Sequence, residues 1–150
     1  SIMHQILNGL LHLHSQDEPI IHYDLKPANI LLHNGEVKLS DFGLSKVMAT
    51  RAAQPMELTS LGAGTPGYLP PECYDGTASR VCPKVDVFSA GVVHYMMLFA
   101  RKPFEVRQIA HAIREETASL DFHSKVSPEG RAFLRLALAP RREERGSVRE

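Results

Sequence analysis

Two short motifs constrain this chain more than any other feature. The first is His22–Asn29, which reads His-Tyr-Asp-Leu-Lys-Pro-Ala-Asn, and the second is Asp41–Gly43, which reads Asp-Phe-Gly. The transfer of a phosphoryl group from a nucleotide requires a carboxylate that orients the hydroxyl nucleophile, and hard oxygen ligands for the Mg²⁺ ion that neutralises the phosphates. Asp24 can serve as that carboxylate, while Asn29 and Asp41 can serve as ligands. The two motifs therefore predict phosphoryl-transfer chemistry.

The residues between the motifs predict a small β-hairpin. Ile30–Leu32 and Val37–Leu39 are apolar segments that flank Asn34-Gly35, a dipeptide that favours a tight hairpin turn. Such a hairpin would place Asn29 at one end and Asp41 at the other. Two magnesium ligands that are distant in the sequence would then face one cleft.

The pattern His-x-Asp-Leu-Lys-Pro-x-Asn followed by Asp-Phe-Gly resembles the catalytic core of eukaryotic protein kinases. A lysine two residues after the catalytic aspartate is the form found in Ser/Thr kinases, and Gly64–Tyr68 matches the segment whose threonine bridges that aspartate and that lysine. The resemblance implies a protein Ser/Thr kinase that uses ATP and Mg²⁺. It assigns catalysis to Asp24, Lys26 and Thr65, ATP contacts to Lys26, Asn29, Leu31 (beneath the adenine ring) and Asp41, and Mg²⁺ to Asn29 and Asp41.

The resemblance covers nearly the whole chain and implies an α+β, protein-kinase-like fold. Residues 1–150 are expected to form one partial kinase domain, a mainly α-helical carboxy-terminal lobe with a short β-hairpin and without the amino-terminal lobe. The 150 residues contain no Gly-rich phosphate loop, no V-A-I-K lysine and no glutamate of a regulatory helix, all of which phosphoryl transfer needs. We therefore interpret the sequence as a piece of a kinase and expect these residues alone to be inactive.

Three helices and a short strand are predicted from local patterns. Ile2–Leu13 has apolar residues at three-to-four spacing after a serine that can cap the helix. Ile20-Ile21 predicts a short strand. Lys84–Phe99 has almost no polar face, which predicts a helix buried through the centre of the domain. Ser127-Pro128 predicts the start of a further helix that ends before Pro140.

The remaining segments have weaker patterns. Leu44–Leu69 shows no sustained periodicity, which favours a long functional or mobile loop. Pro70-Pro71-Glu72 closes this loop and occupies the place of the Ala-Pro-Glu motif of kinases. A weak amphipathic helix is expected around residues 109–113. Residues 141–150 are dense in charge and are expected to be a solvated tail.

Several side chains are expected to have structural partners. Asp86 would be costly to bury without hydrogen-bond donors, and the kinase resemblance implies that it accepts hydrogen bonds from the catalytic-loop backbone. The alternative is an exposed aspartate at the start of a helix. The resemblance also implies that Glu72 pairs with Arg145, and that His22 and Phe42 belong to an apolar stack that aligns the two kinase lobes.

Composition argues against several other function classes. The formal net charge is +0, which gives no general electrostatic reason to expect binding to nucleic acid or to an anionic membrane. Cys73 and Cys82 have no further Cys or His at metal-binding spacing, which suggests a reducing compartment. The longest apolar stretch, Val85–Ala100, is interrupted by polar residues, so we expect no membrane-spanning segment.

Within the kinases, several segments are similar to the Tousled-like family. They are Ile21–Pro27, Asp41–Met48, Met56–Ser60, Gly62–Thr65, Tyr68–Cys73, Lys84–Val87 and Arg101–Phe104. This resemblance implies a kinase that acts on histone-chaperone substrates, forms oligomers through coiled coils outside these residues, and lies in the nucleus or otherwise in the cytoplasm. The chain departs from the family pattern at Pro66-Gly67, where an aromatic pair is expected, at Phe88, where tryptophan is expected, and at Ala100, where glycine is expected.

Two alternatives to an active protein kinase are a pseudokinase that binds partners as a scaffold and a kinase of small molecules. Loss of the base or of the metal ligands would favour the pseudokinase, and Asp24, Asn29 and Asp41 are all present. Thr65 disfavours a small-molecule kinase, because its segment builds a platform for peptides. Tyr23 replaces the arginine that holds a phosphorylated residue in many kinases. We therefore expect activity to depend only weakly on phosphorylation of residues 41–72.

Overall fold

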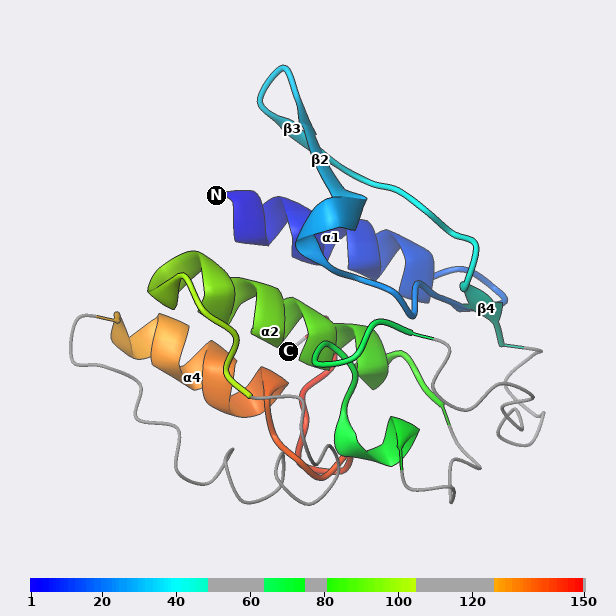
Figure 1. Cartoon of the computed structure of the whole chain (residues 1–150). Helices are drawn as coiled ribbons and strands as arrows, with labels where there is room; N and C mark the ends of the chain where they lie inside the picture. The colour runs from blue at the N-terminus through cyan, green and yellow to red at the C-terminus, as the bar shows by residue number, and fades with distance from the viewer. Residues whose placement is uncertain (49–63, 75–80, 105–125, 150) are drawn as a thin grey trace.

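The computed structural model describes residues 1–48, 64–74, 81–104 and 126–149. Figure 1 shows three helices, α1, α2 and α4, packed in a stack from which a β-hairpin projects on one side. The weak helix expected around residues 109–113 lies outside the described residues, as does the middle of the long loop.

Helix α1 (Ile2–His14) forms as predicted. The Ser1 hydroxyl accepts a hydrogen bond from the backbone N–H of His4 at 3.3 Å, which confirms the predicted cap. The residues buried along α1 are Met3, Ile6 and Leu10, which recur every three or four residues and so lie on one face. This face belongs to the main hydrophobic core, where it packs with residues of α2.

Helix α2 (Lys84–Phe99) lies between α1 and α4, and its residues from Val85 to Val93 are all buried. The predicted burial is wrong for the last turn, where Met97 and Leu98 are 49% and 44% exposed. In this turn only Tyr95, Met96 and Phe99 join the core, so one side of the turn remains open to solvent.

Helix α4 (Pro128–Ala137) begins at the predicted cap, because the Ser127 hydroxyl accepts a hydrogen bond from the N–H of Gly130 at 3.1 Å. It approaches α2 very closely at Gly91. A β-carbon on Gly91 would lie 2.8 Å from the β-carbon of Ala137, so the contact requires glycine at this position.

Two small antiparallel sheets carry the loops of the candidate site. Strands β2 (Ile30–His33) and β3 (Glu36–Leu39) form the predicted hairpin, with Ile30 opposite Leu39. Asn34 and Gly35 form its turn with φ values of 49° and 81°, the left-handed conformations that a two-residue turn requires. Strands β1 (Ile20–Ile21) and β4 (Lys46–Val47) form the second sheet. We predicted β1, whose two residues are both isoleucine, but not β4, because Lys46–Val47 lies in a segment without a sustained hydrophobic pattern.

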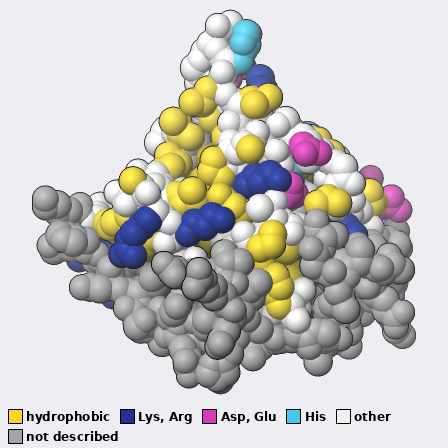
Figure 2. Space-filling model, in the orientation of Figure 1, with side chains coloured by type: hydrophobic (Ala, Val, Ile, Leu, Met, Phe, Trp, Pro, Cys, Tyr) yellow, Lys and Arg dark blue, Asp and Glu magenta, His cyan; other side chains and the backbone are white. Residues whose placement is uncertain are grey.

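The hairpin is held to α1 by the side chain of Gln5, which accepts a hydrogen bond from the N–H of Val37 at 2.9 Å and donates one to the carbonyl oxygen of Gly35 at 3.2 Å. Ile30, Val37 and Leu39 pack against the main core, whereas Leu31 is 51% exposed and Leu32 is 62% exposed. Figure 2 shows hydrophobic side chains on this projecting part of the surface.

Two short 3₁₀ helices, η1 (Pro27–Asn29) and η2 (Pro71–Cys73), complete the described elements. The expectation that residues 141–150 form a solvated tail is wrong for Arg145, which is 1% exposed, because this side chain is inserted between η2 and the start of α2. None of the described helices is long and apolar enough to cross a membrane.

Candidate active site

The loop that carries Asp24 is anchored by Asp86, a buried residue in the first turn of α2. One carboxylate oxygen of Asp86 accepts a hydrogen bond from the backbone N–H of His22 at 2.8 Å, and the other accepts one from the N–H of Tyr23 at 2.9 Å. This confirms the expected role of Asp86 and excludes the exposed alternative. The imidazole of His14 also binds Asp86, at 2.8 Å.

The carboxylate of Asp24 lies at the centre of a compact polar cluster. The Lys26 ammonium group donates to its Oδ2 atom at 2.7 Å, and the Thr65 hydroxyl donates to its Oδ1 atom at 2.5 Å. Lys26 also donates to the Thr65 hydroxyl at 2.8 Å. The structure therefore brings together three residues that lie up to 41 positions apart in the sequence, in the bridging arrangement expected for Thr65.

Asp24 is ionised in this environment. Burial, which leaves the residue 6% exposed, by itself raises the pKa of the carboxyl group. Hydrogen bonds from Lys26 and Thr65, together with the positive charge of Lys26, outweigh that effect and hold the pKa of Asp24 below its usual value. A carboxylate that stays charged at neutral pH can accept a hydrogen bond from a substrate hydroxyl.

Asn29 lies against the same cluster. Its amide nitrogen donates to the backbone oxygen of Asp24 at 2.8 Å and to the Asp24 carboxylate at 3.2 Å. Its backbone oxygen accepts a hydrogen bond from the N–H of Ser40 at 3.0 Å. The two ends of the hairpin are thus joined, as predicted, and Asp41 follows directly.

Asn29 and Asp41 supply donors of the kind that Mg²⁺ prefers. The amide nitrogen of Asn29 faces Asp24, which leaves the amide oxygen on the other side of the planar group. Asp41 is exposed, and its carboxylate accepts one hydrogen bond, from the N–H of Gly43 at 3.3 Å. One amide oxygen and one carboxylate are hard oxygen ligands, so the residues present fit a magnesium ion.

Two residues of the site have left-handed backbone conformations: Tyr23, with φ 68°, and Asp41, with φ 61°. Each such residue costs about 1–3 kcal/mol unless the surroundings stabilise it. Tyr23 is held by its N–H bond to Asp86 and by the complete burial of its side chain. Strain of this kind, placed on both sides of the hairpin, is typical of functional sites.

The side chain of Tyr23 is buried in a second hydrophobic core, so it attaches the loop that carries Asp24 to that core. It packs with Ile21, Leu69, Cys73, Val81 and Val85. The ammonium group of Lys46 lies 5.4 Å from the centre of its ring. Burial raises the pKa of the Tyr23 hydroxyl, so the side chain is neutral. The expectation of weak dependence on phosphorylation stays a prediction, since Thr50, Thr59 and Ser60 lie outside the described residues.

The remaining expected contacts are formed where the structure describes them. The rings of His22 and Phe42 lie 5.0 Å apart, while Leu31 and Phe42 are both about half exposed, on the side of the hairpin. Arg145 forms a two-pronged pair with Glu72, with distances of 2.7 and 3.2 Å, which confirms the expected partner.

His14 is the contact that the sequence did not reveal. Its side chain is 8% exposed and binds the carboxylate of Asp86. The only signal was its position at the end of the first helix, one turn beyond the buried apolar face, which does not identify a partner 72 residues away. The thiol of Cys73 is unreactive in this environment. Burial, and to a smaller extent the nearby Glu72 carboxylate, raise the pKa of Cys73 to about 12, so the thiol stays protonated.

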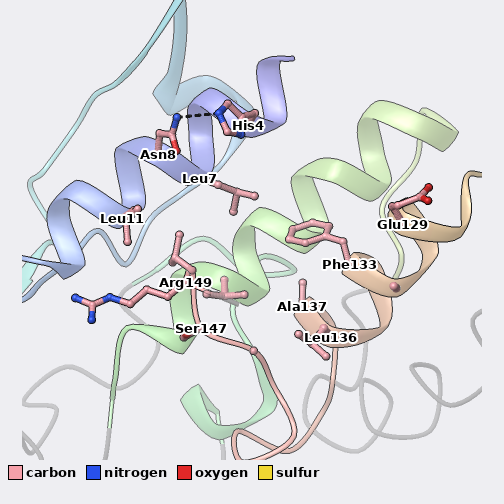
Figure 3. A pocket seen from close by; sticks show the side chains of 14 residues that line it. His4, Leu7, Asn8, Leu11, Glu129, Phe133, Leu136, Ala137, Ser147 and Arg149 are labelled. Carbon is pink, nitrogen blue, oxygen red and sulfur yellow. Dashed lines mark hydrogen bonds between the residues drawn. The ribbon is translucent and has the colours of Figure 1, made fainter.

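A cavity of about 600 Å³ lies elsewhere, between α1, α4 and the chain after α4. Figure 3 shows its mostly apolar lining, which includes Leu7, Leu11, Phe133 and Leu136, with His4 and Arg149 at its edges. None of the candidate site residues lines this cavity.

Comparisons with known proteins agree with this geometry. The family model for the protein kinase domain matches residues 1–150. The chain is 46% identical to serine/threonine-protein kinase tousled-like 2 of Xenopus tropicalis, an alignment that covers 100% of this chain and 24% of that protein. It is 42% identical to serine/threonine-protein kinase TOUSLED of Arabidopsis thaliana, over 98% of this chain and 23% of that protein. The chain thus spans about a quarter of the length of these curated relatives.

Proposed function

Since the chain belongs to the protein kinase family and is similar over its whole length to Tousled-like serine/threonine kinases, we propose that it forms the carboxy-terminal, catalytic lobe of a protein Ser/Thr kinase. The reaction is transfer of the γ-phosphoryl group of ATP to a serine or threonine hydroxyl of a protein. The observation that carries this proposal is the ionised Asp24 carboxylate, which is bound by both Lys26 and Thr65. The loop that carries it is anchored by Asp86 through the backbone N–H groups of His22 and Tyr23.

Each residue of the cluster has one task in the proposed reaction. Asp24 accepts a hydrogen bond from the substrate hydroxyl and so orients it for attack. Lys26 lies beside this carboxylate and offers positive charge where the transferred group accumulates negative charge. Thr65 holds both side chains in place. Asn29 and Asp41 would hold Mg²⁺, which neutralises the phosphate charge when it is bound.

A scaffold without transferase activity is the alternative, and substitution of the proposed base separates the two. In the full-length protein, Asp24→Asn should leave the fold and nucleotide binding in place, because asparagine is nearly isosteric. It should lower kcat by about 10²–10⁴, the range of general acid–base contributions. The measurement is steady-state phosphorylation of a protein or peptide substrate, together with nucleotide titration.

Asp41→Ala is the matched comparison, because it removes a charged ligand rather than the base. It should weaken the binding of Mg²⁺-nucleotide itself. Phosphorylation by Asp24→Asn at the wild-type rate would contradict the role of Asp24, and a wild-type protein that transfers no phosphate to any substrate would favour the scaffold.

Substrates and location are proposed from the family resemblance alone. We propose histone-chaperone-like protein substrates, a nuclear site of action and oligomers formed by other regions of the full-length protein. Phosphorylation of a purified histone chaperone, compared with an unrelated acidic protein of similar size, tests the first of these.

A further inference from the structure

A pair of positively charged residues lies next to the candidate active site. Directly after α2, Ala100 adopts a left-handed conformation with φ 55°, and Arg101 and Lys102 follow. The ammonium group of Lys102 lies 4.3 Å from the centre of the Tyr68 ring and donates a hydrogen bond to the carbonyl oxygen of Pro66 at 3.4 Å. The end of α2 is thereby attached to the segment that follows Thr65.

This position is within reach of a bound peptide. Pro66 is the residue after Thr65, whose hydroxyl contacts Asp24 at 2.5 Å. A substrate hydroxyl that Asp24 orients brings the neighbouring residues of its own chain to the same surface. Since an extended chain advances about 3.3–3.6 Å per residue, a side chain within about three residues of the phosphoacceptor can meet Lys102.

Among the residues that the structure describes, no carboxylate compensates the positive charge here. Neither Arg101 nor Lys102 forms an ion pair with a carboxylate within the part of the chain that the structure describes. Lys26 differs, because Asp24 lies 2.7 Å from its ammonium group. Figure 2 shows Lys and Arg side chains spread across the middle of the face in view. Such a surface favours an anionic group in a ligand.

The Lys102 side chain is also preorganised for binding an anionic group. An ammonium group has three donors, and the carbonyl oxygen of Pro66 accepts from one of them. The contact with the Tyr68 ring restricts the side chain before a ligand arrives, which lowers the entropy that binding must lose. The guanidinium group of Arg101 lies near the Tyr95 ring, at 5.8 Å, and adds a second charge at the exposed end of α2.

We propose that Lys102, supported by Arg101, determines substrate specificity by binding an acidic side chain within about three residues of the phosphoacceptor. This inference rests on the proposed kinase function. The preferred substrate is therefore an acidic peptide segment rather than a basic or apolar one.

The test uses the full-length protein and a set of peptides with one central serine. A single aspartate is moved through the three positions on each side of that serine, and matched peptides carry lysine or alanine instead. For wild type, kcat/KM at the best position should be about threefold to fivefold higher with aspartate than with alanine, as expected for a partly exposed ion pair. Added salt should reduce this ratio.

Three variants test whether the preference for aspartate depends on Lys102. Lys102→Met retains a long apolar stem against Tyr68, and its ratio should fall to about one. Lys102→Glu should reverse the preference in favour of lysine at the same position. Arg141→Ala removes a positive charge that is exposed in the turn after α4, and its ratio should match that of wild type.

The results separate this inference from the proposal on which it rests. Equal rates for the aspartate, alanine and lysine peptides would overturn the inference and leave the kinase function in place. A preference for aspartate that persists in Lys102→Met and Lys102→Glu would also overturn it. Failure of wild type to phosphorylate every peptide and every protein substrate would overturn the proposed function, and the inference with it.

Discussion

At the scale of single residues, the charge state of Asp24 depends on two neighbours. Lys26 and Thr65 both stabilise the ionised form, while burial opposes it. Because folding lowers the pKa of this carboxyl group, its ionisation stabilises the protein fully above the pKa of the unfolded chain, and that contribution is lost as the pH falls through the lower folded-state value.

The consequence for activity is a prediction about the acid limb of the pH profile. In wild type, kcat/KM should not fall as the pH approaches the ordinary aspartate pKa. Lys26→Met removes the largest favourable contributor, so the pKa of Asp24 should rise and the acid limb should move to higher pH, in addition to any loss of rate. The measurement is kcat/KM against pH for both proteins.

Lys38→Met is the control, since Lys38 pairs with the exposed Glu36 on the hairpin, and its pH profile should match that of wild type. An acid limb in Lys26→Met that coincides with that of wild type would contradict the coupling of Lys26 to Asp24.

The residues of the site were predictable because they occupy fixed positions in two short motifs. Residue type and spacing predict that Asp24, Asn29 and Asp41 lie close together, and the structure joins Asn29 to Asp24 and to Ser40, the residue before Asp41. His14 and Lys46 could not be found in this way. Their contacts, with Asp86 and with the Tyr23 ring, depend on how separate elements pack, and neither residue belongs to a motif.

At the scale of elements, Arg145 joins the turn in which it lies to η2, through Glu72, and to the start of α2, through Lys84. Besides Glu72, its guanidinium group binds the carbonyl oxygens of Ala139, at 3.0 and 3.1 Å, and of Lys84, at 3.3 Å. It also lies 5.0 Å from the centre of the Phe88 ring. The side chain is fully buried, whereas that of Glu72 is 25% exposed.

This asymmetry predicts unequal effects of substitution. Arg145→Ala should lower the free energy of unfolding of the kinase domain by about 3–5 kcal/mol, because it leaves a carboxylate and several carbonyl oxygens without their donor. Glu72→Gln retains one acceptor oxygen but leaves the buried guanidinium group without its counter-charge, so it should cost somewhat less, about 1.5–3 kcal/mol. Urea unfolding of the two variants measures the difference.

Arg141→Ala gives the baseline, because the Arg141–Glu144 pair is exposed and should contribute less than about 1 kcal/mol. If Arg145→Ala lowered the free energy of unfolding no more than Arg141→Ala does, the stabilising role of Arg145 would be refuted.

Most elements followed from local pattern, and the exceptions have physical reasons. The caps at Ser1 and Ser127 and the Asn34-Gly35 turn each act within four residues, so the sequence predicts them directly. The pairing of β1 with β4 joins distant segments through two residue pairs, Ile20 with Val47 and Ile21 with Lys46. Nothing local in either segment specifies that partner.

At the scale of the whole molecule, apolar side chains remain in solvent on the hairpin side. Leu31, Leu32, Phe42 and Val47 are each between 46% and 62% exposed. An apolar surface of this kind is typical of a contact with another part of a protein. It agrees with the expectation that a further lobe covers this side, which the sequence suggested only through the kinase resemblance.

We predict that residues 1–150 expressed alone self-associate and bind no nucleotide measurably. The exposed apolar side chains promote association, and the partners that hold the nucleotide from the other side are not among these residues. Light scattering after size-exclusion chromatography measures the first property, and calorimetry with Mg²⁺ and ATP measures the second.

Leu32→Glu should increase the monomeric fraction. Leu136→Glu changes the same type of side chain on α4, where it is also exposed, and should have less effect. Tight, magnesium-dependent binding of ATP by residues 1–150 would refute the prediction.

The anchoring of the catalytic loop by Asp86 has a consequence for mutational tolerance. Asp86 binds the backbone N–H groups of His22 and Tyr23 and makes no use of their side chains. Every amino acid except proline offers the same N–H group, so a new side chain at position 23 keeps this anchor, although it loses the buried ring that helps to hold the left-handed backbone. A phosphate-binding arginine at position 23 can therefore be gained or lost in evolution while Asp86 still binds the backbone of the loop that carries Asp24. In the proposed kinase, control of activity can therefore evolve separately from catalysis.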